Sequence, residues 1–134
     1  MIIVDLNLKA GMTGQAREKV TLDNTALRFG SGTVKVYATP AMIGLMEKAS
    51  INCVDSHLPD GLASVGTNVE IRHLAATPIG MEAVAEAELI EIEGFKLKFA
   101  VAAYDGRDKI GEGTHTRYVI NLEEFLKKAD AKLD

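Results

Sequence analysis

The sequence has little of what several classes of protein require. Its single cysteine, Cys53, has no partner for an intrachain disulfide and cannot build a multi-cysteine metal site. His57 and His115 have no metal-ligand spacing with each other or with the cysteine. No run approaches the roughly 20 apolar residues that a membrane-spanning helix requires. We therefore expect no metal site and no membrane span.

Positive charge is not concentrated anywhere along the chain. The formal net charge is -4, and lysine and arginine occur singly or in pairs, so the basic patch that binds nucleic acid or an anionic membrane is missing. The stretch MIIVDLNLKAG starts apolar, but Asp5 interrupts it and no basic region precedes it, unlike in a signal peptide. We expect a cytoplasmic protein that binds neither nucleic acid nor membranes, with Cys53 as a small buried residue.

What is present indicates a folded globular protein. Of 134 residues, 47% are hydrophobic and 25% are charged, which is typical of such proteins. A chain of this size buries well over half of the surface that its unfolded form exposes. We expect a single domain over residues 1–134.

Hydrophobic periodicity predicts one long helix and several strands. Thr39 and Pro40 predict the start of the helix, with Thr39 as the N-cap and Pro40 at the first helical position. Apolar side chains wrap most of this helix until it ends around residues 57–61, which indicates that it is buried. Extended segments are expected at 14–21, 34–38, 64–75, 80–93, 95–105 and 109–121, with a short amphipathic helix at 122–133.

A buried helix followed by an antiparallel meander predicts an α+β fold in which a single sheet curls around the helix. An apolar helix in so small a protein also needs cover from a second copy. We therefore expect a homodimer.

His73 lies in the predicted strand VGTNVEIRHLAATPIG. Alternation places it on one face with Val65, Thr67, Val69 and Ile71, so its imidazole is expected to point inward or toward an interface. Its unperturbed pKa near 6.5 suits proton transfer at neutral pH. Periodicity alone favours a hydrogen-bonded core histidine over a catalytic one.

Glu47 and Thr39 also have structural as well as chemical interpretations. Glu47 follows the apolar run AMIGLM, and either marks the solvated stripe of the helix with Lys48 or is buried and paired. Thr39 is of a residue type that commonly caps helices. The capping box is incomplete, however, because Met42 stands where Glu or Gln would reach back, which leaves the hydroxyl free for other contacts.

A hydroxyl, a carboxylate and an imidazole are the groups that acyl transfer to water uses. Eight helical residues span about 12 Å, which is too far for Thr39 and Glu47 to act on one carbon atom from the same straight helix. If both serve one site, Glu47 must reach it from the neighbouring subunit. This geometry predicts a dimer with two composite sites at its interface.

Three blocks, VYATPAMIGLMEKAS, VGTNVEIRHLAATPIG and YDGRDKIGEGTHTRYVI, resemble in order and spacing the hot-dog-fold thioesterases related to fluoroacetyl-CoA thioesterase. The resemblance covers nearly the whole chain. It implies a long helix wrapped by an antiparallel sheet, assembly as a dimer, and a catalytic set of threonine, glutamate and histidine. By motif position these are Thr39, Glu47 and His73.

The resemblance also implies contacts with the substrate. Gly66 matches a glycine that family members place beside the acyl group. Thr33 stands where the enzymes specialised for a fluorinated acyl group carry an aromatic gate, so a more general small acyl-CoA is the expected substrate. Apart from the resemblance, charge alone makes Arg72 and Arg117 candidates for contact with the CoA phosphates, and the alternative is that both are ordinary solvated arginines.

The expected function is hydrolysis of a small acyl-CoA thioester to the free acid and CoA, without a cofactor because CoA belongs to the substrate. Amide groups at the helix start near Thr39 would stabilise the oxyanion, with His73 as acid or base and Glu47 as base or as the group that orients the imidazole. Thr39 is either a nucleophile or a group that orients water or substrate. The alternatives are a non-catalytic acyl-CoA-binding or sensing module on the same fold and an enoyl-CoA hydratase.

Overall fold

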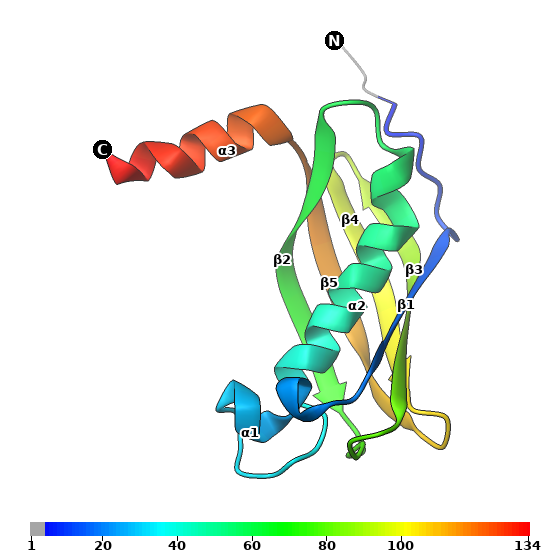
Figure 1. Ribbon diagram of the computed structural model, residues 1–134. Coiled ribbons are helices and arrows are strands. Elements are labelled where there is room, and N and C mark those ends of the chain that lie inside the picture. Colours follow the sequence, from blue (N-terminus) through cyan, green and yellow to red (C-terminus); the bar gives the residue numbers. More distant parts are fainter. Residues whose placement is uncertain (1–4) are drawn as a thin grey trace.

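The computed structural model describes residues 5–134 and shows an α+β fold. Helix α2 (Thr39–Val54) lies along one face of a curled, five-stranded antiparallel sheet (Figure 1). The strands are β1 (Thr13–Lys19), β2 (Leu62–His73), β3 (Glu82–Glu93), β4 (Lys96–Tyr104) and β5 (Lys109–Asn121). Two shorter helices are α1 (Ala26–Phe29) and α3 (Leu122–Asp130). The prediction of one sheet curled around a buried helix is confirmed.

The strand order is β1-β3-β4-β5-β2. Strands β3, β4 and β5 form the predicted meander, but the expectation that β2 continues it is wrong, because β2 pairs with β5 at the far edge of the sheet. The chain between β2 and β3 does not close a hairpin: Pro78 bridges Val36, and the Tyr37 N–H donates to the Thr77 carbonyl at 2.8 Å. The strand expected at 34–38 is accordingly reduced to isolated bridges.

Helix α2 contributes much of the core. It packs against β1, β3 and β4, and strand β1 approaches it closely at Gly14, where an added Cβ would lie 2.3 Å from the Ala49 carbonyl oxygen. Cys53 is 1% exposed, and burial raises the pKa of its thiol, so the prediction of a small buried residue is confirmed. The helix residues that are buried are Ala41, Met42, Leu45, Met46, Ala49, Ser50, Cys53 and Val54.

The start of α2 differs from the prediction by one residue. Ala38 is the N-cap, and its carbonyl accepts a hydrogen bond from the Met42 N–H at 3.0 Å. Thr39 is therefore the first helical residue and Pro40 the second, and no side chain caps the helix. The prediction of Thr39 as the cap is wrong, and its hydroxyl is free to contact another element.

Strand β2 carries a bulge at Thr67, between Gly66 and Asn68. The extra residue reverses the alternation of side chains at that point. His73 and the two aliphatic residues nearest to it along the strand share the inner face, as predicted, but Val65 falls on the opposite face and the prediction for it is wrong. Gly66 lies on the inner face instead, opposite side chains of α2 and β5.

Helix α3 follows β5 directly and extends away from the rest of the molecule (Figure 1). The Asn121 side chain caps it by accepting from the Glu124 N–H at 3.0 Å, which matches the predicted amphipathic helix. Between β1 and α2 the chain forms a single 3-10 turn at Leu22–Asn24 and then α1. Among residues 5–134, no helix has the length and apolar character needed to cross a membrane.

Candidate active site

Thr39 and His73 lie in contact at the first turn of α2. The Thr39 Oγ1 atom is 2.6 Å from His73 Nδ1, a distance typical of a strong hydrogen bond. Thr39 reaches this position because it opens the helix, and His73 because it ends β2 on the inner face of the sheet. The structure thus brings together two of the three predicted catalytic residues.

The imidazole of His73 is neutral and can accept a proton at one ring nitrogen and donate one from the other. Burial is the largest influence on this group and lowers its pKa below the ordinary value of 6.5, so the ring is uncharged at neutral pH. Its Nε2 atom is buried and has no hydrogen-bond partner among residues 5–134. A buried polar atom without a partner is uncommon and calls for one from outside the chain, such as a substrate or a second subunit.

Glu47 lies farther along α2 and has different neighbours. Its side chain is 40% exposed, and its Oε2 atom lies 3.6 Å from Arg117 Nη1. The sequence offered a solvated Glu47 or a buried and paired one. The structure lies between the two, because the carboxylate is half-buried and paired. Gly66 lies next to it: an added Cβ would be 2.9 Å from Glu47 Oε2 and 3.3 Å from Arg117 Nη1. The absence of a side chain at Gly66 therefore lets the backbone of β2 lie close to the carboxylate.

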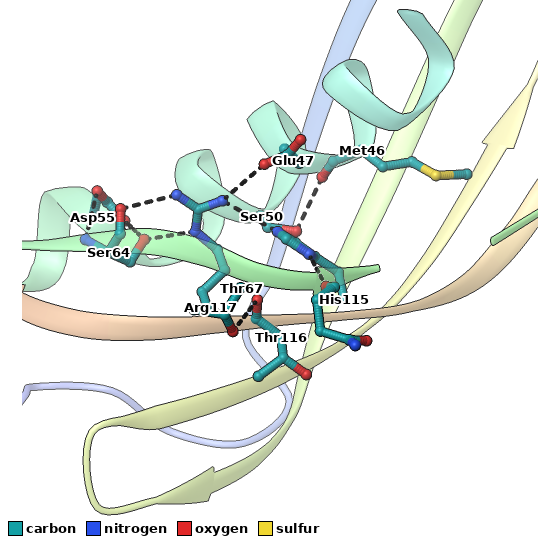
Figure 2. A network of polar contacts seen from close by, with 10 residues as sticks. Met46, Glu47, Ser50, Asp55, Ser64, Thr67, His115, Thr116 and Arg117 are labelled. Atoms are coloured by element: carbon teal, nitrogen blue, oxygen red, sulfur yellow. Dashed lines mark hydrogen bonds and ion pairs between the residues drawn. The ribbon is translucent and has the colours of Figure 1, made fainter. Parts of the chain in front are cut away.

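Arg117, on β5, is held on every edge of its guanidinium (Figure 2). Its Nε donates to Ser64 Oγ at 2.8 Å and its Nη2 to the Ser64 carbonyl at 2.9 Å. Its Nη1 lies 3.1 Å from His115 Nε2, and His115 Nδ1 lies 2.8 Å from the Asn68 carbonyl. A carbonyl only accepts, so His115 carries its proton on Nδ1 and accepts from Arg117 at Nε2. Burial lowers the pKa of His115, as does the neighbouring positive charge.

The two groups of residues are separate within one chain. Helix α2 is unbroken from Thr39 to Val54, so Glu47 lies about 12 Å along the axis from Thr39. No hydrogen bond or ion pair within the described residues joins Thr39 or His73 to Glu47. A broad hollow lies on the outer face of the sheet. Arg72, a candidate for contact with the CoA phosphates, lines it, but Thr39, Glu47 and His73 do not.

The remaining predicted residues have distinct positions. Gly66 adjoins Glu47, Arg117 is 4% exposed and points at the same carboxylate, and Thr33 is exposed in the segment between α1 and α2. Arg117 was expected on charge alone to meet CoA phosphates. Its burial and its side-chain partners place it instead inside the fold, next to Gly66.

Three residues of this network were not predicted. They are Ser64, His115 and Asp55, whose carboxylate accepts from the Ser64 hydroxyl at 2.6 Å. They come together only because β2 pairs with β5, which the predicted meander did not contain. A partial signal was available, since His115 and Arg117 are two residues apart and so share one face of a strand. Within residues 5–134, no cluster of three or more histidine, cysteine or acidic side chains is arranged to hold a metal ion.

Comparisons with known proteins agree with this architecture. The family described as fluoroacetyl-CoA-specific thioesterase matches residues 20–123. A fluoroacetyl-CoA thioesterase from Streptantibioticus cattleyicolor is 45% identical over 98 residues, which are 73% of this chain and 70% of that protein.

Two solved structures extend the comparison. A mutant of FlK in complex with acetyl-CoA has a TM-score of 0.87 and 34% identity, over 95% of this chain and 100% of the other. A hot-dog-like protein from Thermanaerovibrio acidaminovorans has a TM-score of 0.88 and 22% identity, over 98% of each chain. The second likeness shows that the fold is the hot-dog fold.

Proposed function

This chain belongs to the fluoroacetyl-CoA-specific thioesterase family, and on that premise we propose that it hydrolyses the thioester of a small acyl-CoA to the free acid and CoA. The observation that carries the proposal is the 2.6 Å contact between Thr39 Oγ1 and His73 Nδ1 at the start of α2. A hydroxyl bonded to a neutral imidazole is the arrangement of an activated nucleophile. The proposal takes residues 1–134 as one catalytic domain.

The first step is transfer of the acyl group to Thr39. His73 Nδ1 accepts the hydroxyl proton while the Thr39 oxygen bonds to the thioester carbonyl carbon. The C–S bond then breaks, and the CoA thiolate takes the proton from His73, so that free CoA leaves and an acyl ester remains on Thr39. Ala41 is the first residue after Pro40 with an N–H group, and this amide with the positive end of α2 would stabilise the oxyanion.

The second step uses water and Glu47. The carboxylate removes a proton from the water molecule that attacks the ester carbonyl. The bond from the carbonyl carbon to Thr39 Oγ1 then breaks, and the proton held by Glu47 passes through His73 to Thr39 Oγ1. The free acid leaves, and the carboxylate, the neutral imidazole and the hydroxyl are restored. Because α2 separates Glu47 from Thr39 within one chain, we propose that the carboxylate comes from Glu47 of the partner subunit. The Nε2 atom of His73 is buried and has no hydrogen-bond partner within residues 5–134, which supports a site that is completed from outside the chain.

The substrate class follows from Gly66, Arg117 and Thr33. The resemblance places Gly66 beside the acyl group, and its surroundings are crowded, because an added Cβ would lie 2.9 Å from Glu47 Oε2 and 3.3 Å from Arg117 Nη1. Surroundings so crowded suit a short acyl group better than a long one. Thr33 supplies no aromatic side chain at the position that the resemblance assigns to a gate, so the proposed range is wider than fluoroacetyl. Buried, single Cys53 is compatible with the proposed location, the cytoplasm.

The test is thiol release from a panel of acyl-CoAs, with His73→Ala and Glu47→Ala as variants and Lys48→Ala as a control on the exposed side of the same helix. We expect turnover of short acyl-CoAs, and a loss of about a hundredfold or more in the two site variants. If the wild type binds acyl-CoA but does not turn it over, the thioesterase hypothesis is rejected and the hypothesis of a non-catalytic acyl-CoA-binding module is supported.

A further inference from the structure

Asp55 and Ser64 form a bonded chain that ends on Arg117. We infer that they are positioning residues, which fix the Arg117 guanidinium against the Glu47 carboxylate and so hold that carboxylate in place for the second step of hydrolysis. The inference rests on the proposed function. It adds two residues that touch neither the acyl group nor the reacting atoms.

The orientation of the Ser64 hydroxyl is the first step of the argument. Asp55 Oδ1 accepts from Ser64 Oγ at 2.6 Å, and Asp55 Oδ2 accepts from the Ser64 N–H at 3.2 Å. A serine hydroxyl has one proton and two lone pairs. Since the proton is committed to Asp55, the lone pairs face Arg117 Nε, which donates to them at 2.8 Å.

The position of Arg117 then follows. Ser64 takes the Nε and Nη2 edge of the guanidinium, so the Nη1 edge is directed at His115 and Glu47. A guanidinium is planar and rigid, and two contacts on one edge therefore fix the direction of the other. Figure 2 shows this arrangement, with Asp55 and Ser64 on one side of Arg117 and Glu47 on the other.

Charge explains why Glu47 alone does not hold the arginine. Arg117 is 4% exposed, and a buried charge is costly without close partners. The carboxylate of Glu47 is 3.6 Å away and 40% exposed, which makes a loose pair. Burial lowers the pKa of Arg117, while the negative charges of Asp55 and Glu47 raise it, so Asp55 supplies compensating charge on the inner side.

The kinetic test compares Asp55→Asn and Ser64→Ala with Ser50→Ala. Ser50 is an equally buried hydroxyl on α2 that bonds only to the Met46 carbonyl, so it controls for the loss of a buried hydroxyl. We expect kcat to fall about tenfold in the first two variants, with KM little changed, because misplacing a catalytic group slows the chemical step. In an Arg117→Met background the Asp55→Asn change should have no further effect, since a positioning residue acts only through its target.

A second readout needs no catalysis. The other four arginines have exposed side chains, so Arg117 should give the slowly exchanging arginine Nε–H signal in an NMR spectrum, assigned by its loss in Arg117→Met. We expect Asp55→Asn and Ser64→Ala to speed its exchange with water, and Ser50→Ala to leave it unchanged.

The outcomes separate this inference from the proposed function. An active wild type whose Asp55→Asn and Ser64→Ala variants keep both kcat and a protected Nε–H would overturn the inference and leave the thioesterase intact. Equal effects of Asp55→Asn with and without Arg117 would also overturn it, because the loss would then be general. A wild type without turnover would reject the proposed function, whatever the NMR signal shows.

Discussion

The Oγ1 atom of Thr39 lies 2.6 Å from the Nδ1 atom of His73, although the two residues are 34 positions apart in the chain. Thr39 has no capping role, because Ala38 is the N-cap of α2. The hydroxyl is therefore committed to the imidazole and not to the helix. Chemistry and stability should respond differently when it is removed.

Thr39→Ala is expected to lower kcat by about a hundredfold or more, because the imidazole loses the group that it activates. Thr39→Ser keeps the hydroxyl and should retain activity within about tenfold of the wild type. Thermal unfolding should be nearly unchanged in both, whereas loss of a true N-cap typically costs about 1 kcal/mol. A clear loss of stability with full activity in Thr39→Ala would restore the capping role and remove the catalytic one.

The decline of kcat/KM at acidic pH should follow the protonation of His73. Burial lowers its pKa below 6.5, and only the neutral ring accepts the Thr39 proton. The value of kcat/KM is therefore expected to be level around neutral pH and to fall only once the pH drops below about 6.5, as the ring becomes protonated. Thioester absorbance is the suitable readout, because it does not depend on ionisation of the released thiol. An acid limb centred above pH 7 would assign the essential base to another group.

The sequence predicted the elements better than their pairing. The hydrophobic periods indicated α2 and the four long strands, and motif positions selected Thr39 and His73. The place of β2 beside β5 was not predicted, because nothing local distinguishes a strand that closes a hairpin from one that crosses to the far edge. That choice depends on distant contacts such as the bridge between Val36 and Pro78.

The bulge at Thr67 had a similar effect on the site. A strict alternation through β2 places Val65 on the face of His73, but one extra residue moves Gly66 there instead. Gly66 thereby comes to lie against Glu47, and Ser64, two residues earlier on the same face, reaches Arg117. The buried polar network could not be predicted for this reason. Its bonds from Arg117 to Ser64 and from His115 to the Asn68 carbonyl join strands that pair only in the folded chain.

Substitutions at two closely packed glycines, Gly14 and Gly66, should affect stability and activity differently. At Gly14 an added Cβ would meet backbone atoms, 2.3 Å from the Ala49 oxygen and 2.5 Å from the Cys53 nitrogen, which cannot move without shifting α2 or β1. Gly14→Ala is expected to lower the free energy of unfolding by about 1–3 kcal/mol. At Gly66 the nearest atom belongs to the flexible side chain of Glu47, so Gly66→Ala should change stability less and displace the carboxylate.

Denaturant unfolding and kcat, measured on the same two variants, check this expectation. Gly66→Ala should lose at least tenfold in kcat, because misplacement of a catalytic group has effects on the order of 100-fold. Gly14→Ala should keep most of its activity per folded molecule. If Gly66→Ala hydrolyses acyl-CoA at the wild-type rate, the position of the Glu47 carboxylate against Gly66 does not matter for catalysis.

The composite arrangement of Thr39 and Glu47 is open to a complementation experiment. Thr39→Ala and Glu47→Ala are each expected to be nearly inactive as homodimers. In a dimer that contains one copy of each, one site carries both substitutions and the other carries neither, because the two residues reach a given site from different subunits. When the variants are unfolded together and refolded in equal amounts, half of the dimers are mixed, and each mixed dimer has one intact site of two. Activity should then return to about one quarter of the wild-type value.

The control is a refolded mixture of Thr39→Ala with His73→Ala, which act from the same subunit and should not complement. An inactive mixture of Thr39→Ala with Glu47→Ala, in which mixed dimers are present, would place all three residues in one chain and require α2 to bend.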